Sequence, residues 1–270
     1  MTDQSTVTDT STEWDTRGRK RRFARYVGLL TTFVVVAISW RALNVRYEYV
    51  ETAPESVRDL LNRMYPPDAA YANEIVGPLL ETINIAVLGT GLAILLALPV
   101  AFIGAENTTP NRATYLLGKF LIVASRSVNV IIWAIIFVFL FGTSALAGVL
   151  AVGFRSIGFV AKLIAEEIEE INPTQVEAVR ATGASRTQTL LYGIVPQVKP
   201  AFVGVSVYRW DINVRSSTII GFVGAGGIGM ELQNSIDFLD WHRVLTILIA
   251  ILAVVLVSEL ISAYLRSKVR

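Results

Sequence analysis

Five charged residues lie within or beside long uncharged stretches, where their side chains could handle a charged substrate. Asp211 and Arg215 are four residues apart with the acid first, so on a helix we expect them to pair. Arg209 has no acid at local helical spacing. Its charge needs water, a helix end, a neighbouring subunit or an anionic substrate. Arg126 and Arg155 also lie within or beside long uncharged stretches of the sequence.

A charge at the middle of a bilayer costs about 2.5 to 3.5 kcal/mol on insertion scales, so such residues face protein or water. The guanidinium fork of arginine matches phosphate-type oxygens two at a time, so these arginines could line a path for an oxyanion. The alternative for Arg126 and Arg155 is that the side chain extends to the membrane surface. The alternative for the Asp211 and Arg215 pair is a structural role. Glu259 is expected to bond between helices rather than to relay protons.

A serine, threonine and glycine segment follows this charged cluster. Its glycines spell GxGxxG, but no strand precedes them and no acid stands about 20 residues on, which argues against a dinucleotide site. We expect close helix packing or an unwound backbone, with a gate or substrate contact as a further hypothesis. The residues concerned are Ser217, Thr218, Gly224, Gly226, Gly227 and Gly229.

Composition argues against several classes of chemistry. The 270 residues include no cysteine and one histidine, which removes disulfides, thiolate metal sites and histidine-rich zinc centres. No GxxxxGK[ST] phosphate loop is present, so neither a metal nor a cofactor is expected in this chain. The net charge of +2 is too small to suggest a nucleic acid partner. Charged residues make up 17%, against about a quarter in soluble domains.

The elements that must position these residues are long apolar helices. A bilayer core of about 30 Å needs about 20 helical residues. The uncharged stretches are continuous rather than alternating, which excludes a strand barrel and predicts an all-α membrane protein. Six transmembrane helices are predicted at 26–43, 80–103, 119–141, 145–165, 200–222 and 244–265.

The orientation follows from the basic residues. Six Lys and Arg residues between 17 and 25 precede the first helix and should stay in the cytoplasm, which places both termini there. A cleaved signal peptide ending near Ala37-Ile38-Ser39 is the competing interpretation. Residues 1–25 are expected to form a disordered basic tail. The first helix and an external loop span 26–78, the main membrane domain spans 79–265, and 266–270 form the cytoplasmic C-terminus.

Two segments outside the membrane have helical signals. The loop 44–78 contains an amphipathic piece that could lie on the bilayer surface. In the cytoplasmic segment 166–199, Asn172 can cap a helix whose first residue is Pro173, and Gly183 can end that helix. A second short helix follows, and Pro196 and Pro200 are expected to break the chain before the fifth span. A helix pair of this kind suits docking into the groove of a partner.

This segment resembles the cytoplasmic loop of permease subunits of ABC importers. The family pattern is E-A-A, three residues, G, nine residues, then I-x-L-P. Glu177, Ala178, Gly183 and Pro196 match it, while valine, glycine and valine replace the second Ala, the Ile and the Leu. By resemblance, this loop is the coupling helix that contacts the ATP-hydrolysing subunit.

Residues 60–265 resemble the phosphonate-type permeases more closely, above all from Tyr208 to Gly229. One departure is Asn129-Val130, where that family tends to have Pro-Glu. The resemblance implies the type I ABC importer permease (MetI-like) architecture in the cell membrane and a homodimer. It also implies two ATPase subunits that bind ATP and Mg, and an extracytoplasmic solute-binding protein. The chain would be a transport subunit and not an enzyme, and its cargo a phosphonate, phosphate or phosphite.

Three other functions remain open at this point. The chain could be an ABC permease for another small solute such as an amino acid. It could also be an ATP-independent secondary transporter or channel, which predicts inverted repeats and membrane carboxylates for ion coupling. Only Asp211 and Glu259 are available for that role. A membrane-embedded enzyme would need an acid-base constellation that the sequence lacks.

Overall fold

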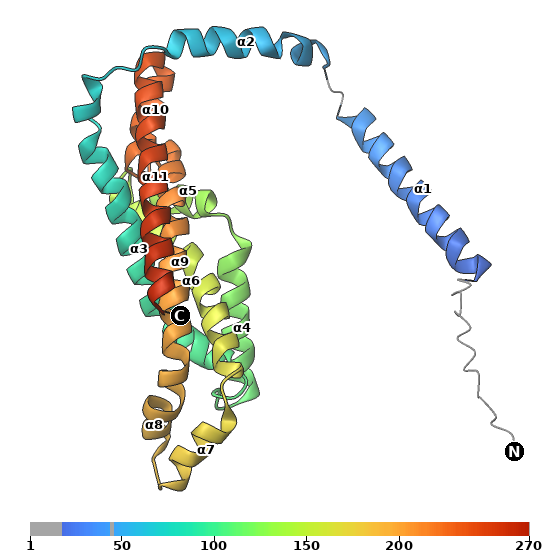
Figure 1. Cartoon of the computed structure of the whole chain (residues 1–270), viewed down its shortest axis with the longest axis vertical. Coiled ribbons are helices and arrows are strands. Elements are labelled where there is room, and N and C mark those ends of the chain that lie inside the picture. Colours follow the sequence, from blue (N-terminus) through green and yellow to red (C-terminus); the bar gives the residue numbers. More distant parts are fainter. Residues whose placement is uncertain (1–17, 44–45, 270) are drawn as a thin grey trace, which may run out of the picture. The chain divides into compact units, whose positions relative to one another are not determined.

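A computed structural model describes residues 18–43 and 46–269, and within these ranges the chain is helical without any strand. The expected disorder of the N-terminal tail falls mostly outside the described residues. The described chain divides into two compact units, with the boundary between Asp59 and Leu60. Each unit is described by itself (Figure 1).

The first unit contains α1 (Arg19–Ala42) and most of α2 (Glu48–Met64). In α1, the 21 residues from Arg22 to Ala42 are long and apolar enough to cross a membrane. None of the described side chains in that stretch is buried against other parts of the chain. The amphipathic helix predicted within the external loop is present as α2, and it is longer than the apolar spacing suggested.

The second unit holds the other helices. In chain order they are η1 (Tyr71–Asn73), α3 (Val76–Gly104), α4 (Arg112–Ser127), α5 (Val130–Phe141), α6 (Ala145–Glu169), α7 (Pro173–Ala181), α8 (Arg186–Thr189), η2 (Leu190–Ile194), α9 (Val195–Ile220), η3 (Gly221–Val223), α10 (Ile228–Asp237) and α11 (Trp241–Val269). Four stretches of this unit are long and apolar enough to span a membrane: Tyr71–Gly104, Ala145–Glu169, Arg186–Val223 and Trp241–Lys268.

The prediction of one straight helix over 119–141 is wrong. The chain bends by 89° between α4 and α5. Val128 is extended, and the side chain of Asn129 accepts a hydrogen bond from the N–H of Ile131, so it caps a new helix. The described residues therefore contain five membrane-length helices, or six if the bent pair is one span. The predicted all-α membrane fold is confirmed, with this span broken.

Small residues bring the central helices of the second unit together. Ala86, Ala93 and Ala97 of α3 and Ala151 of α6 are fully buried, and α3, α6 and α9 pack against one another. A Cβ atom on Gly89 would lie 2.8 Å from Val152, so α3 and α6 approach more closely there than larger side chains would allow. This packing fixes the relative positions of the polar residues that these helices carry.

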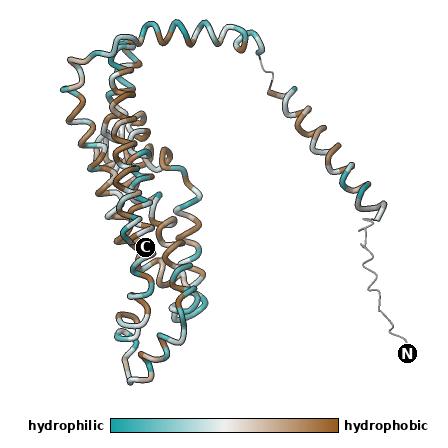
Figure 2. Tube along the Cα trace, in the orientation of Figure 1, coloured by the Kyte–Doolittle hydropathy of each residue, from teal (hydrophilic) through white to brown (hydrophobic). Residues whose placement is uncertain are grey.

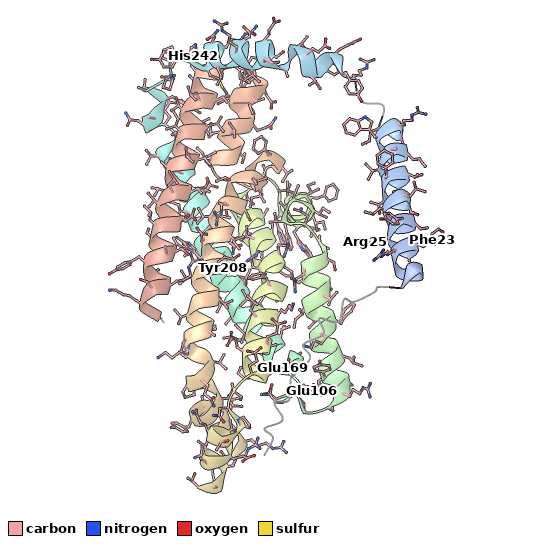
Figure 3. All side chains as sticks on the ribbon, turned by 45° about the vertical axis from the view of Figure 1, so that its right-hand side comes forward. Phe23, Arg25, Glu106, Glu169, Tyr208 and His242 are labelled. Carbon is pink, nitrogen blue, oxygen red and sulfur yellow. The ribbon has the colours of Figure 1, made fainter. Side chains whose placement is uncertain are left out.

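Hydrophobic residues predominate along the helices of the second unit, and hydrophilic residues gather at the α3–α4 turn and around α7 and α8 (Figure 2). Glu106 and Glu169 lie near this hydrophilic end, whereas His242 lies at the opposite end of the same unit (Figure 3). The second unit therefore has two polar ends separated by an apolar middle, as expected of a protein that spans a bilayer.

Candidate functional site

A chain of buried polar side chains links the three central helices. The Asn213 amide of α9 donates to Thr90 Oγ1 of α3 at 2.8 Å. Ser156 of α6 donates to Asn213 Oδ1 at 3.0 Å. Ser156 Oγ also accepts a hydrogen bond from Nε of Arg209 at 2.8 Å. All four side chains are buried, so α3, α6 and α9 are held in register by hydrogen bonds as well as by packing.

Arg209 is a buried cation without an acid beside it. Its side chain is 5% exposed, and its guanidinium carbon lies 5.1 Å from the centre of the Phe159 ring. Arg155 of α6 lies within Coulombic range of Arg209 and of Arg126 at the end of α4. One terminal nitrogen of Arg155 is buried without a hydrogen-bond partner. We call Arg126, Arg155 and Arg209 the arginine row.

No member of the arginine row forms an ion pair within the described residues. The row runs from Arg126, which is exposed, through the partly exposed Arg155 to the buried Arg209. At its buried end the like charges of Arg155 and Arg209 repel each other, and a polyatomic anion is the ligand that offsets that repulsion best. The sequence predicted each arginine separately, but their proximity depends on how α4, α6 and α9 pack.

The opposite side of α9 carries a compensated cluster. Arg215 and Asp211 form the expected ion pair. Asp211 also accepts a hydrogen bond from Ser258 of α11 at 3.1 Å. Glu259, on the same helix, lies 3.8 Å from Arg215, so the expected bond between helices is an ion pair. α9 therefore presents uncompensated positive charge towards α6 and a largely paired cluster towards α11.

The glycine-rich segment forms a tight turn between α9 and α10. Gly224, Gly226 and Gly227 have φ between +77° and +83°, where other residues are strained. A Cβ atom on Gly229 would lie 2.2 Å from the carbonyl oxygen of Thr218, so the backbones of α9 and α10 touch there. The N–H of Ile228 donates to Thr82 of α3 at 2.8 Å. This segment therefore combines close backbone packing with a non-helical turn.

The hydroxyl groups proposed for a gate bond within their own helix. Ser217 donates to the Asn213 carbonyl at 2.8 Å, and Thr218 donates to the Arg215 carbonyl at 2.7 Å. Both side chains are buried. Their hydrogen bonds stabilise the last turns of α9, next to the glycine turn.

The cytoplasmic segment forms a helical elbow, which we define as residues 172–196. Asn172 caps α7 through the N–H of Thr174, and Pro173 is the first residue of that helix. Gly183 turns the chain with a φ of +82°. Ser185 and Gln188 then form a reciprocal cap on α8. The start at Asn172, the turn at Gly183 and the second short helix were predicted, because each depends on a few neighbouring residues, whereas the Ser185 and Gln188 cap was not.

The expected break at Pro196 and Pro200 is wrong. Membrane-length helix runs from Arg186 to Val223, through α8, η2 and α9, without interruption. A wider helical turn over Leu190–Ile194 precedes Pro196, and its altered hydrogen-bond pattern lets the helix continue past the proline. Pro200 lies inside α9 and does not end it either. The second arm of the elbow is therefore continuous with the fifth span.

The inner side of the elbow is anchored to the membrane helices. Val176 is buried in a cluster with Ile194 and Val198. The Gly193 backbone approaches Val176 closely, because a Cβ atom at that glycine would lie 3.5 Å from the Cα atom of Val176. Gln197 bonds both to the N–H of Asn172 and to the carbonyl of Gly193. Glu177 and Ala178, by contrast, are exposed.

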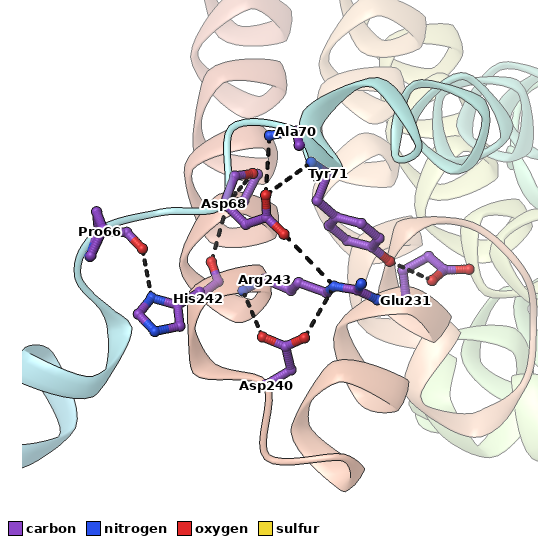
Figure 4. Close-up of polar contacts among 9 residues, drawn as sticks. Pro66, Asp68, Ala70, Tyr71, Glu231, Asp240, His242 and Arg243 are labelled. Carbon is purple, nitrogen blue, oxygen red and sulfur yellow. Dashed lines mark hydrogen bonds and ion pairs between the residues drawn. The ribbon is translucent and has the colours of Figure 1, made fainter.

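A cluster of polar contacts at the other end of the unit is absent from the sequence predictions (Figure 4). Arg243 pairs with Asp240 at 3.0 Å and with Asp68 at 3.9 Å. The Tyr71 hydroxyl donates to Glu231 at 2.9 Å. The spacing of Asp240 and Arg243 is a visible signal, since residues three apart are neighbours on a helix. The contacts with Asp68 and between Tyr71 and Glu231 join segments far apart in sequence, so no local pattern predicts them.

Known proteins resemble this chain in sequence. The family model described as "Binding-protein-dependent transport system inner membrane component" matches residues 89–270. A phosphite transport system permease protein of Stutzerimonas stutzeri is 42% identical over 211 residues, covering 78% of this chain and 77% of the relative. A putative phosphite transport system permease protein of the same organism is 34% identical over 252 residues, covering 93% and 88%.

Other comparisons extend to a phosphate permease and to solved structures. A phosphate-import permease protein of Mycolicibacterium smegmatis strain ATCC 700084 / mc(2)155 is 39% identical over 223 residues, covering 81% of this chain and 42% of the relative. An inward-facing methionine ABC transporter has a TM-score of 0.63 at 21% identity, covering 73% of this chain and 96% of that chain.

The last comparison shows the fold alone. This fold is the predicted MetI-like architecture of ABC importer permeases. The family model covers α6, the elbow, α9 and α11, which carry most of the residues described above. The chain therefore belongs to the binding-protein-dependent transport system inner membrane component family, and it is a permease subunit of an ABC importer.

Proposed function

We propose that this permease moves a small phosphorus oxyanion, namely phosphite, phosphonate or phosphate, into the cell. The observation that carries the proposal is the arginine row, whose three charges lack an acidic partner among the described residues. The relatives named for phosphite and phosphate transport support the same class of cargo. A separate ATPase subunit would supply the energy, with ATP and Mg bound there.

The electrostatics of the arginine row favour an anion over other cargoes. Arg155 and Arg209 repel each other inside the protein, and the charge of an oxyanion between α6 and α9 would relieve that repulsion. A zwitterionic amino acid has no net charge, so repulsion of its ammonium group offsets the attraction of its carboxylate. The fold shared with a methionine transporter therefore does not favour an amino acid cargo.

Ion-coupled transport without ATP has less support. Such a transporter needs membrane carboxylates that can bind and release an ion. Asp211 is buried and is occupied by Arg215 and Ser258. Glu259 lies beside Arg215, so neither acid is free to take up a coupling ion.

The proposed assembly contains two copies of this chain, two ATPase subunits and an extracytoplasmic solute-binding protein. Arg215 is 42% exposed and Glu259 is 58% exposed in the single chain, although both lie within membrane-length helices. Charged groups at that depth face protein or water rather than lipid. A second copy packed near α9 and α11 would cover them. The basic residues at the start of α1 favour a cytoplasmic location for both termini.

Reconstituted transport tests the cargo. Proteoliposomes that hold the chain, its ATPase and its solute-binding protein are expected to take up at least one of the three oxyanions only when ATP is supplied to the ATPase. Methionine and other zwitterions should neither be taken up nor compete, because repulsion of their ammonium group offsets the attraction of their carboxylate to the arginine row. Uptake that proceeds without the ATPase, or that prefers a zwitterion, would contradict the proposal.

Co-purification with the ATPase tests the elbow as the coupling element. Glu177 is exposed on α7, so Glu177→Lys reverses a charge at the proposed contact. Gly183→Val strains the turn, because only glycine adopts a φ of +82° at low cost. Each variant is expected to retain about a tenth or less of the ATPase bound to the original chain. Glu170→Lys, at an exposed residue that ends α6, is the matched control and should retain it fully.

A further inference from the structure

A polar cavity lies at the cytoplasmic end of the second unit, and no member of the arginine row lines it. Its volume is about 610 Å³. One wall is the α3–α4 turn, with Asn107, Thr108 and Pro110. The other wall is the elbow, with Arg180 from α7 and Arg186 from α8. The cavity thus opens between two segments that lie far apart in the sequence.

The lining of this cavity is positively charged. Arg180 and Arg186 supply two guanidinium groups, and no carboxylate is among the lining residues. Neither arginine has an ion pair within the described part of the chain. The nearby Glu169 is engaged elsewhere, because it accepts the N–H of Glu106 at 2.9 Å and lies 3.6 Å from Lys119. An anion would therefore meet two cations and no competing acid.

The wall formed by the α3–α4 turn is held by its own hydrogen bonds. The Asn107 amide donates to the carbonyl of Ile168 at 2.5 Å, which ties the turn to α6. The Thr108 hydroxyl donates to the Phe102 carbonyl at 2.7 Å. A wall fixed before the ligand arrives loses little entropy when the ligand binds.

The opposite wall is equally defined. Gly183 sets the angle between the two arms of the elbow, and the reciprocal cap formed by Ser185 and Gln188 fixes the first turn of α8. Arg180 and Arg186 stand on either side of this turn. Their spacing therefore depends on the rigid elbow rather than on a loose loop.

Size and lining identify the class of ligand. A cavity of 610 Å³ falls within the range of sites that hold small organic molecules, and it is far larger than an inorganic oxyanion requires. Pro110, Leu190 and Ile194 add apolar surface beside the two arginines. We propose that this cavity binds a phosphate ester, with the phosphate on Arg180 and Arg186 and the organic part against the apolar wall. Only the cytoplasmic location rests on the proposed function.

Direct binding tests this site without transport or an ATPase. The full chain is purified into nanodiscs of zwitterionic lipid, and phenyl phosphate is titrated by calorimetry. Binding is expected to weaken about tenfold or more in the Arg180→Gln and Arg186→Gln variants, because each removes a charge-assisted bond. Arg112→Gln is the matched control, since Arg112 is an exposed arginine at the start of α4 that does not line the cavity. Phenol, which lacks the phosphate, should not bind.

A lipid headgroup could supply the same phosphate ester. In nanodiscs that contain phosphatidylglycerol, a lipid headgroup that occupies the cavity would weaken the binding of phenyl phosphate. If the natural ligand is instead a water-soluble phosphate ester, phenyl phosphate should bind as it does in zwitterionic nanodiscs. Absence of phenyl phosphate binding in zwitterionic nanodiscs, or equal binding by the original chain and the variant with both substitutions, overturns the proposal. If the site binds phenyl phosphate but no oxyanion is transported, the proposed function fails and this inference stands.

Discussion

Arg209→Gln is expected to reduce oxyanion uptake about 100-fold while the protein stays folded. Arginine can hold two oxygens of an oxyanion, and each charge-assisted hydrogen bond contributes about 1.5 to 3 kcal/mol. Glutamine offers a single amide without charge. The substitution also removes the positive charge that attracts the anion between α6 and α9. The proposed transport pathway therefore loses the buried charge of the arginine row.

Stability should change in the opposite direction to transport. Arg209 is buried beside Arg155 without an acid among the described residues, so its removal relieves a repulsion that offsets the loss of its hydrogen bond to Ser156. We expect the thermal midpoint of Arg209→Gln to equal or exceed that of the original chain. A residue that served the fold alone would instead lower the midpoint when replaced.

The measurement combines ATP-driven uptake in proteoliposomes with thermal unfolding of the same preparations. Arg112→Gln, an exposed arginine outside the arginine row, is the control and should leave both values unchanged. Uptake by Arg209→Gln within about threefold of the original rate would show that Arg209 is not part of the transport pathway. A large fall in the thermal midpoint would show that Arg209 has a structural role instead.

Gly229→Ala is expected to cause the largest loss of stability among single methyl additions. A Cβ atom there would lie 2.2 Å from the Thr218 carbonyl oxygen and 2.9 Å from the Cα atom of Gly221. Both are backbone atoms, so α9 and α10 would have to separate rather than a side chain rotate. Overpacking of this kind costs about 1 to 3 kcal/mol, and more where backbone must move.

Gly204→Ala is the matched control for this substitution. Gly204 is in α9 as well, but nothing lies within 4 Å of its hypothetical Cβ atom. Alanine there should stabilise the helix by up to about 1 kcal/mol. Thermal unfolding in detergent, followed by tryptophan fluorescence, should show a midpoint for Gly229→Ala about 5 to 10 °C lower than that of the original chain. Equal midpoints for the two variants would show that α9 and α10 do not touch.

Features that depend on neighbouring residues were predictable from the sequence. Continuous apolar runs indicate membrane helices because the bilayer requires a fixed helical length. The caps at Asn172 and Gly183 and the pair of Asp211 with Arg215 depend on spacings of one to four residues. Such spacings fix geometry once a helix forms, whatever surrounds it.

Features that depend on packing between distant segments were decided only by the tertiary structure. The sharp bend at Asn129 and the continuous helix through Pro196 both differ from the prediction. Hydrophobicity alone does not distinguish a broken apolar run from a straight one, and a wider helical turn lets a helix continue past a proline. The bonds of Asn213 with Thr90 and Ser156 join residues 123 and 57 positions apart. The close approach of small residues on α3, α6 and α9 brings such groups together, and no local spacing encodes it.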